Sequence, residues 1–157
     1  MSMEFDSDTV IVVASPNELK LLDKYVQIPT GKFTLIVSGI GYGNVYSTLK
    51  DIPTDCKIIN VGYAGSNRIP KGTVCKIGES RNYHPNVTFE EKIYTLTGGN
   101  TICYSSADFV TSTEVETPCV FDMELYAIMS MGFTNVSAIK VVSDSLNYKE
   151  YEDTSRN

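Results

Sequence analysis

Every residue of Thr9–Ala14 (TVIVVA) is either apolar or β-branched, and this run is the strongest indication of the fold. A short apolar run without alternation, closed by Ser15-Pro16, is typical of a strand buried on both faces of a sheet. Similar runs follow at Phe33–Ser38 (FTLIVS), Cys56–Val61 (CKIINV) and Ser137–Val142 (SAIKVV). Together they predict an α/β sheet that is covered by helices on both faces.

The segments between these runs predict the remaining elements. Helices are expected from near Pro16, in a short stretch ending at about Lys50, and over Asp122–Met131. Residues 73–77 are expected to form a strand, and residues 82–105 to be rich in strands, with a hairpin turn at residues 98–100. The prediction is therefore one domain, residues 1–157, of the α/β class, with a central mixed sheet between two layers of helices.

The composition excludes several classes of function. A chain of 157 residues with a net charge of −6 lacks the clustered positive charge that nucleic-acid binding needs. Its first ten residues have no signal-peptide pattern, and no apolar run approaches the roughly 20 residues of a membrane helix. Four widely spaced cysteines and one histidine show no metal-binding spacing. We expect a cytoplasmic protein with reduced thiols, no metal, no cofactor, and no nucleic-acid or membrane partner.

Small or polar residues follow four of the expected strands, at Ala14-Ser15, Ser38-Gly39, Val61-Gly62 and Ser143-Asp144. In open α/β sheets, ligands bind outside the carboxyl ends of the strands. Glycines at such ends let the backbone approach a ligand closely. The sequence therefore predicts a small-molecule site at one edge of the sheet.

Seven short motifs stand in order between residues 11 and 144: Ala14–Leu22 (ASPNELKLL), Ser38–Gly41 (SGIG), Ile59–Gly65 (INVGYAG), Tyr83-His84 with Asn86–Thr88 (NVT), Ser105–Val110 (SSADFV), Phe121–Glu124 (FDME) and Val142–Asp144 (VSD). Each is weak by itself, but their order resembles that of the nucleoside phosphorylase and nucleosidase superfamily. The chain is most similar to the 5′-methylthioadenosine/S-adenosylhomocysteine nucleosidases. The resemblance implies a purine nucleoside as ligand and hydrolysis of its N-glycosidic bond.

That reaction needs a proton for the departing base, stabilisation of an oxocarbenium-like sugar, and a nucleophile. The resemblance makes Asp144 the candidate acid and Glu18 the candidate base that positions and activates water. An aspartate that only caps the turn after a strand is the alternative for Asp144, and a solvated first-turn glutamate is the alternative for Glu18. The carboxylate of Glu18 stands where phosphorylase relatives carry an arginine, so hydrolysis is preferred to phosphorolysis.

The remaining site residues also come from the resemblance. Glu124 is expected to accept hydrogen bonds from the ribose hydroxyls, with Met123 lying against the sugar. The alternative for Met123 and Glu124 is an ordinary helix start. Phe109 and Val110 are expected to form the slot that binds the base, and the alternative for them is an ordinary core strand. Further lining of the pocket is assigned to Ile40, Ala64 and Gly65, and a contribution to a neighbouring subunit's site to Phe89.

Two features separate this chain from the resembled family. The stretches between Thr88 and Thr101 and between Val110 and Asp122 are shorter, and only thirteen residues follow Asp144, where relatives carry a C-terminal helix. A trimmed fold is therefore expected, assembled as a homodimer or higher homo-oligomer that covers exposed sheet surface. Two other functions stay open at this point: a purine nucleoside phosphorylase, and a catalytically degenerate protein that binds a nucleoside or nucleotide without turning it over.

Overall fold

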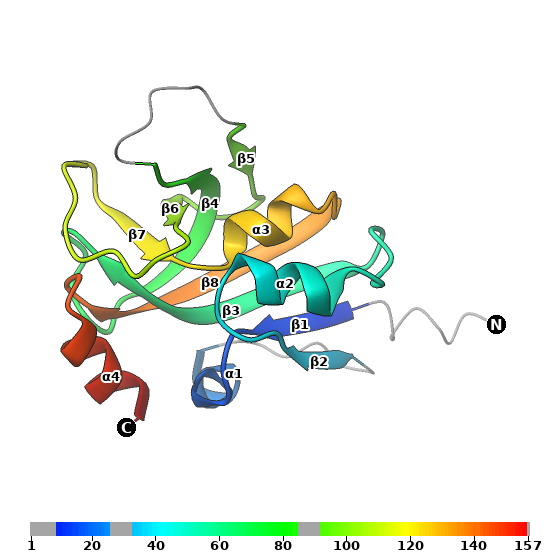
Figure 1. The fold of residues 1–157 in the computed structure, drawn as a ribbon, viewed down its shortest axis with the longest axis horizontal. Helices are drawn as coiled ribbons and strands as arrows, with labels where there is room; N and C mark the ends of the chain where they lie inside the picture. The colour runs from blue at the N-terminus through cyan, green and yellow to red at the C-terminus, as the bar shows by residue number, and fades with distance from the viewer. Residues whose placement is uncertain (1–8, 26–32, 85–91, 157) are drawn as a thin grey trace.

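The structure, a computed structural model, describes residues 9–25, 33–84 and 92–156. Within these ranges eight strands form one mixed sheet (Figure 1). The strands are β1 (Thr9–Val13), β2 (Thr34–Val37), β3 (Lys57–Ser66), β4 (Val74–Asn82), β5 (Tyr94–Thr95), β6 (Thr101–Ser105), β7 (Cys119–Asp122) and β8 (Asn135–Asp144). The predicted α/β class with a central mixed sheet is confirmed.

The pairing of the strands brings several chain segments to one edge of the sheet. Strands β2, β1, β3 and β8 run parallel in that order, so their carboxyl ends lie at the same edge. Strand β8 then pairs with β4, β4 with β6, β6 with β7, and β7 returns to pair antiparallel with the end of β3. Because of this closure, the end of β7 meets the carboxyl end of β3 at Gly65 and Phe121.

Helices cover both faces of the sheet and define two apolar cores. Helices α2 (Tyr42–Leu49) and α3 (Leu125–Ser130) lie in front of the sheet in Figure 1 and enclose the larger core, which includes Leu49 and Ile128. Helix α1 (Lys20–Tyr25) covers the opposite face with Leu21 and Leu22. The short 3₁₀ helix η2 (Pro16–Glu18) connects β1 to α1, and helix α4 (Tyr148–Arg156) ends the chain.

The helix predicted over Asp122–Met131 is wrong at its start. Asp122 does not begin a helix, because Cys119–Asp122 is strand β7 and α3 starts only at Leu125. The four residues of β7 are all buried. Their pairing with β3 and β6 outweighs the helical pattern of the residues that follow them in the sequence. After Asp144 the chain forms helix α4, Tyr148–Arg156.

The hairpin predicted at residues 98–100 is also wrong. Strands β5 and β6 do not pair with each other but with opposite edges of β4, antiparallel and parallel respectively. The connection between them crosses β4 at Gly78, where an added Cβ would lie 2.4 Å from the carbonyl oxygen of Gly99. The glycines are needed for this close crossing of two backbones rather than for a tight turn.

Candidate active site

Glu18 lies at the carboxyl end of β1, and the protein's own backbone holds both of its oxygens. Oε1 accepts hydrogen bonds from the amides of Ala14 (2.8 Å) and Ser15 (3.3 Å), and Oε2 accepts one from Tyr63 (2.7 Å). The carboxylate packs directly on Gly62 of β3, where an added Cβ would lie 2.6 Å from Oε2. Glu18 is only 5% exposed, so it is not the solvated first-turn residue of the alternative interpretation.

Asp144 lies at the carboxyl end of β8 and packs against the same strand, β3. An added Cβ on Gly65 would lie 2.8 Å from Oδ2 of Asp144. The register of β3 and β8 shifts at this point, since Ala64 pairs with Val142 but Gly65 pairs with Asp144. This bulge gives β8 one extra residue, Ser143, and turns Asp144 onto the face of the sheet that a regular strand would have given to Ser143.

The surroundings of Asp144 support both interpretations of this residue. Oδ2 accepts a hydrogen bond from the amide of Asn147 at 3.1 Å. This bond caps the turn after β8, as the alternative interpretation of Asp144 requires. Oδ1 accepts a hydrogen bond from the hydroxyl of Ser143 at 2.6 Å. Burial raises the pKa of Asp144, the bonds from Ser143 and Asn147 oppose this, and the net pKa lies above the ordinary value. The group is therefore a capping aspartate that also holds its proton more firmly than usual.

Asp122 and Lys140 form a buried ion pair between β7 and β8. Their Oδ2 and Nζ atoms are 2.9 Å apart, and both side chains are almost fully enclosed. Oδ1 of Asp122 accepts a short hydrogen bond from the hydroxyl of Ser105, and Oδ2 accepts another from the amide of Leu125 at 2.9 Å. Burial raises the pKa of Asp122, but Lys140 and these hydrogen bonds more than offset it, so the carboxylate stays ionised.

Glu124 stands two residues later, at the start of α3, and behaves differently. Its Oε2 accepts a hydrogen bond from the amide of Gly41, at the turn before α2, at 2.9 Å. Burial and the negative charge of Asp122 raise the pKa of Glu124 to about 8, with Glu18 adding to the effect and Lys140 opposing it. At neutral pH this carboxyl group is mostly protonated, and so it is able both to donate and to accept a hydrogen bond.

The acidic groups belong to one electrostatic cluster. Glu18 and Glu124 both act on the ammonium of Lys140, and the charge of Glu18 helps to raise the pKa of Glu124. Asp144 joins them through Tyr151 of α4, because the charges of Glu18, Glu124 and Asp144 all help to raise the pKa of that phenol. Charged residues from η2, β7, β8 and the start of α3 thus influence one another at this edge of the sheet.

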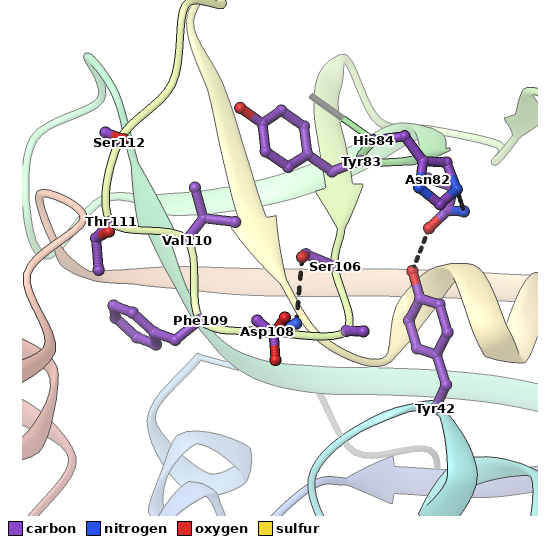
Figure 2. Close-up of a pocket in the computed structure, with 11 residues that line it drawn as sticks. Tyr42, Asn82, Tyr83, His84, Ser106, Asp108, Phe109, Val110, Thr111 and Ser112 are labelled. Atoms are coloured by element: carbon purple, nitrogen blue, oxygen red, sulfur yellow. Dashed lines mark hydrogen bonds between the residues drawn. The ribbon is translucent and has the colours of Figure 1, made fainter. Parts of the chain in front are cut away.

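The predicted base-slot residues lie in the loop after β6. Phe109 directs its ring toward α4, with centroids 5.2 Å from Tyr148 and 5.7 Å from Tyr151. Figure 2 shows Val110 in the same loop, facing a cavity of about 390 Å³ whose other wall contains Tyr42 and Asn82. The Tyr42 hydroxyl donates a hydrogen bond to Oδ1 of Asn82 at 2.6 Å across this wall.

The other predicted lining residues are distributed unevenly. Gly65 contacts Asp144 directly, whereas Ala64 is packed in the core, with its carbonyl oxygen 3.4 Å from the hydroxyl of Ser143. Ile40 is 48% exposed and precedes the glycine that binds Glu124. Met123 is half-buried between Asp122 and Glu124. Phe89 lies outside the described residues.

Sequence reasoning gave no role to three residues of this cluster. Lys140 was passed over because it sits inside an apolar strand, although a lysine in such a position is itself a signal that an acidic partner lies nearby. Ser105 and Tyr151 carry no comparable signal, because a serine at a strand end and a tyrosine in a polar helix are common. In the described part of the chain, no three His, Cys, Asp or Glu side chains are arranged to hold a metal ion. No described helix is long and apolar enough to cross a membrane.

Comparison with known proteins supports the resemblance at the level of fold. The sequence matches no protein-family model and no curated protein. Solved structures, however, share its architecture over nearly the whole chain. One is the nucleosidase MTAN of Chlamydia trachomatis, with a TM-score of 0.76 and 20% identity, covering 94% of this chain and 88% of that one.

Two further solved structures have the same fold. The 5′-methylthioadenosine/S-adenosylhomocysteine nucleosidase of S. pneumoniae, solved with a transition-state inhibitor, gives a TM-score of 0.71 at 17% identity and covers 94% of this chain and 93% of that one. The futalosine hydrolase of Helicobacter pylori gives 0.73 at 13% identity, with 96% and 91% covered. The protein thus has the fold of the nucleoside phosphorylase and nucleosidase class, as its motifs predicted.

Proposed function

We propose that this protein is a purine nucleosidase, which hydrolyses the N-glycosidic bond of an adenosine-type nucleoside of the 5′-methylthioadenosine/S-adenosylhomocysteine class. The observation that carries the proposal is the excess of buried acidic groups over buried basic groups at this edge of the sheet. Four buried acids, Glu18, Asp122, Glu124 and Asp144, accompany one buried lysine. Because such a cluster cannot ionise completely, it stores protons at neutral pH, and a leaving base needs a proton.

In the proposed mechanism, Asp144 protonates the departing base. Burial raises the pKa of Asp144, and a higher pKa favours the protonated form from which a general acid acts. Glu18 orients a water molecule and accepts its proton, so that the water oxygen bonds to the sugar carbon as the bond to the base breaks. The products are the free base, which carries the proton from Asp144, and the free sugar, which carries the hydroxyl group.

The sugar is assigned to Glu124, with Met123 against it. A carboxyl group whose pKa is about 8 is partly protonated, and it offers one donor and several acceptors to a pair of ribose hydroxyls. Lys140 keeps Asp122 ionised beneath Glu124, so the proton shared by the pair resides on Glu124. The base is assigned to Phe109 and Val110, and the remaining lining to Ile40, Ala64 and Gly65. Phe89 is proposed to reach a neighbouring subunit's site.

The direct test is to incubate the protein with 5′-methylthioadenosine and to measure free adenine. We expect release by the wild-type protein, and a loss of about 100-fold or more in kcat for Asp144→Asn and Glu18→Gln. Asp51→Asn, which changes an exposed carboxylate after α2, is the control and should behave like wild type. Absence of adenine release by folded protein at high concentration would refute the proposal. A rate that depends on phosphate would instead favour the phosphorylase alternative.

A second candidate function is nucleoside binding without turnover. One observation favours it: both oxygens of Glu18 and both oxygens of Asp144 already accept hydrogen bonds from the protein itself. These hydrogen bonds occupy lone pairs of the two carboxyl groups that would otherwise bind a water molecule or the departing base. Calorimetry that shows tight binding, followed by recovery of unchanged nucleoside, would support this candidate against the nucleosidase.

We further propose that the protein is a cytoplasmic homodimer. The support comes from apolar side chains that are more than two-fifths exposed on the edge strand β2 and the turn after it, namely Leu35, Val37 and Ile40. A patch of this kind is typical of an interface between subunits. Sedimentation of wild type should give twice the chain mass of 17.3 kDa, and Val37→Lys should shift it toward the monomer. A monomer at high concentration would contradict this assignment.

A further inference from the structure

Tyr151 of α4 connects the C-terminal helix to the carboxylate cluster. Its half-buried ring packs against the apolar core beneath α1. The ring centroid also lies 5.7 Å from that of Phe109 and 5.9 Å from that of Tyr148. Tyr148, by contrast, is 54% exposed and stands at the outer end of this group of rings. Of the two tyrosines, Tyr151 therefore faces inward.

Hydrogen bonds fix α4 at this edge of the sheet. The hydroxyl of Thr154 donates to the carbonyl oxygen of Ser143 at 3.0 Å, next to Asp144 on β8. The ammonium of Lys20 donates to the carbonyl oxygen of Ser155 at 2.9 Å, which ties the end of α4 to α1. The position of Tyr151 is thus set by bonds that lie three and four residues further along the helix.

Helix α4, which carries Tyr151, packs against η2, where Glu18 lies, and against β8, which ends at Asp144. Burial and the charges of Glu18, Glu124 and Asp144 contribute to raising the pKa of Tyr151 to about 12, so the phenol keeps its proton at every physiological pH. Among residues 9–25, 33–84 and 92–156, none accepts a hydrogen bond from this hydroxyl. The site therefore contains a neutral donor that is available to a ligand.

Such a donor complements the rest of the site. Ionised carboxylates only accept hydrogen bonds, so they satisfy the hydroxyl and amino groups of a nucleoside but not its acceptors. The ring nitrogens of a purine and the ether oxygen of the sugar are acceptors, and burying one without a donor weakens binding. The phenol of Tyr151 adds a donor that, unlike the proton of Glu124, is not lost as the pH rises and, unlike the proton of Asp144, is not transferred in the proposed reaction.

We propose that Tyr151 is a specificity-determining residue, whose hydroxyl donates a hydrogen bond to an oxygen or nitrogen acceptor of the nucleoside held between Glu18, Glu124 and Asp144. The inference rests on the proposed nucleoside site, but not on hydrolysis. Phe109 and Tyr151 then form two adjoining walls of that site, one from the loop after β6 and one from α4.

The test compares Tyr151→Phe with Tyr148→Phe. Both substitutions remove one hydroxyl from α4 and keep the ring, but only the first removes the inward donor. The probe is an adenosine C-nucleoside, whose carbon–carbon link cannot be hydrolysed, and its affinity is measured by calorimetry. We expect a Kd about tenfold higher for Tyr151→Phe, the effect of one lost hydrogen bond, and a Kd within about twofold of wild type for Tyr148→Phe.

The same variants separate binding from turnover. With hydrolysable nucleoside, Tyr151→Phe should raise KM by about the same factor and leave kcat within about threefold. Equal affinity of wild type and Tyr151→Phe would overturn the inference, and so would an equal loss in both variants, which would assign the effect to the helix. Failure of wild type to bind the C-nucleoside would overturn the inference together with the proposed function. Binding without base release would count against hydrolysis alone, and the affinity of Tyr151→Phe would still decide the role of Tyr151.

Discussion

Asp122 and Glu124 are two residues apart at the junction of β7 and α3, and they are equally buried at 5% and 6% exposure. Their pKa values nevertheless move in opposite directions. Lys140 lies 2.9 Å from Asp122, and with two hydrogen bonds it holds the pKa of Asp122 below its ordinary value. Glu124 receives one amide hydrogen bond, and burial next to the charged Asp122 raises its pKa to about 8. Burial alone therefore does not decide the protonation state; the nearest cation does.

The comparison indicates that the two neighbouring acids differ in protonation state at neutral pH. Asp122 is held in the ionised form by Lys140, whereas the carboxyl group of Glu124 keeps its proton up to a pH of about 8. Enzymes that need an acid and a base at one pH commonly separate neighbouring carboxyl groups in this way. The following substitutions test the difference between the pKa values of Asp122 and Glu124.

Replacing Lys140 by methionine should have the largest effect. It leaves Asp122 buried without its cation, and breaking a buried ion pair on one side costs about 3–5 kcal/mol of unfolding free energy. Lys140→Arg keeps the charge and is expected to lose less than half as much. Denaturant unfolding of both variants gives the measurement. Equal stability of Lys140→Met and wild type would mean that Asp122 is already protonated in the folded protein.

Glu124→Gln should remove one source of pH dependence. The pKa of Glu124 lies near its ordinary 4.5 in the unfolded chain and at about 8 in the folded protein, so between these values the folded state binds more protons. Stability therefore falls as pH rises through this window, with a slope of at most about 1.4 kcal/mol per pH unit for one proton.

In Glu124→Gln, the profile of melting temperature against pH should be flatter between those two pH values, although Glu18 and Asp144 keep part of the slope because their pKa values are also raised. Nucleoside hydrolysis should fall by about 100-fold, if the carboxyl group binds the ribose hydroxyls. An unchanged pH profile of stability would show that Glu124 is ionised throughout.

Ser105→Ala tests the hydrogen bonds that keep Asp122 ionised. The serine hydroxyl donates to Asp122 and accepts from the amide of Tyr126, so its removal should cost about 1–2 kcal/mol. Ser80 offers a matched control, since it is equally buried on the neighbouring strand β4 and its hydroxyl has no partner among the described residues. Ser80→Ala should change the stability by less than about 0.5 kcal/mol. Equal losses in thermal denaturation would indicate a packing effect only.

Gly41→Ala should have the smallest specific effect, on the single amide bond to Glu124. Gly41 and Gly72 have φ values of 96° and 90°, and an added Cβ would meet no atom within 4 Å at either position. Alanine should therefore cost a similar amount at both, about 1 kcal/mol. Only Gly41→Ala should also reduce nucleoside hydrolysis, by a few-fold, because it disturbs the amide that binds Glu124. Equal activity of the two variants would separate this bond from function.

Much of the fold could be predicted because the central parallel strands contain continuous apolar runs, such as residues 10–13 in β1. The runs that became β1, β3 and β8 lie between two layers of helices, and that environment imposes a pattern that is visible in the sequence. Strand β7 could not be predicted in the same way. Its four residues run directly into a helical pattern, and only the partners β3 and β6, distant in sequence, make it a strand.

The residues of the candidate site likewise fall into those that could be predicted from the sequence and those that could not. The residues Glu18, Glu124 and Asp144 were predicted as site residues from short motifs of the resembled family, and the structure buries all three. The orientation of Asp144 was not predictable, since it depends on a bulge opposite Gly65 that has no local sequence signal. Lys140 was also missed, because its meaning depends on Asp122, which reaches it only after the sheet has closed.

The sequence by itself determined the class of the fold, the edge of the sheet where polar groups collect, and the order of the acidic residues along the chain. These follow from hydrophobic periodicity and from residues placed at the ends of elements, which are local properties. Only the folded chain brings Lys140 to Asp122 and leaves Glu124 with a raised pKa. The protonation state of each acid depends on its burial and on charges that distant segments bring close to it. A pKa responds to these spatial surroundings and not to the neighbouring residues in the sequence.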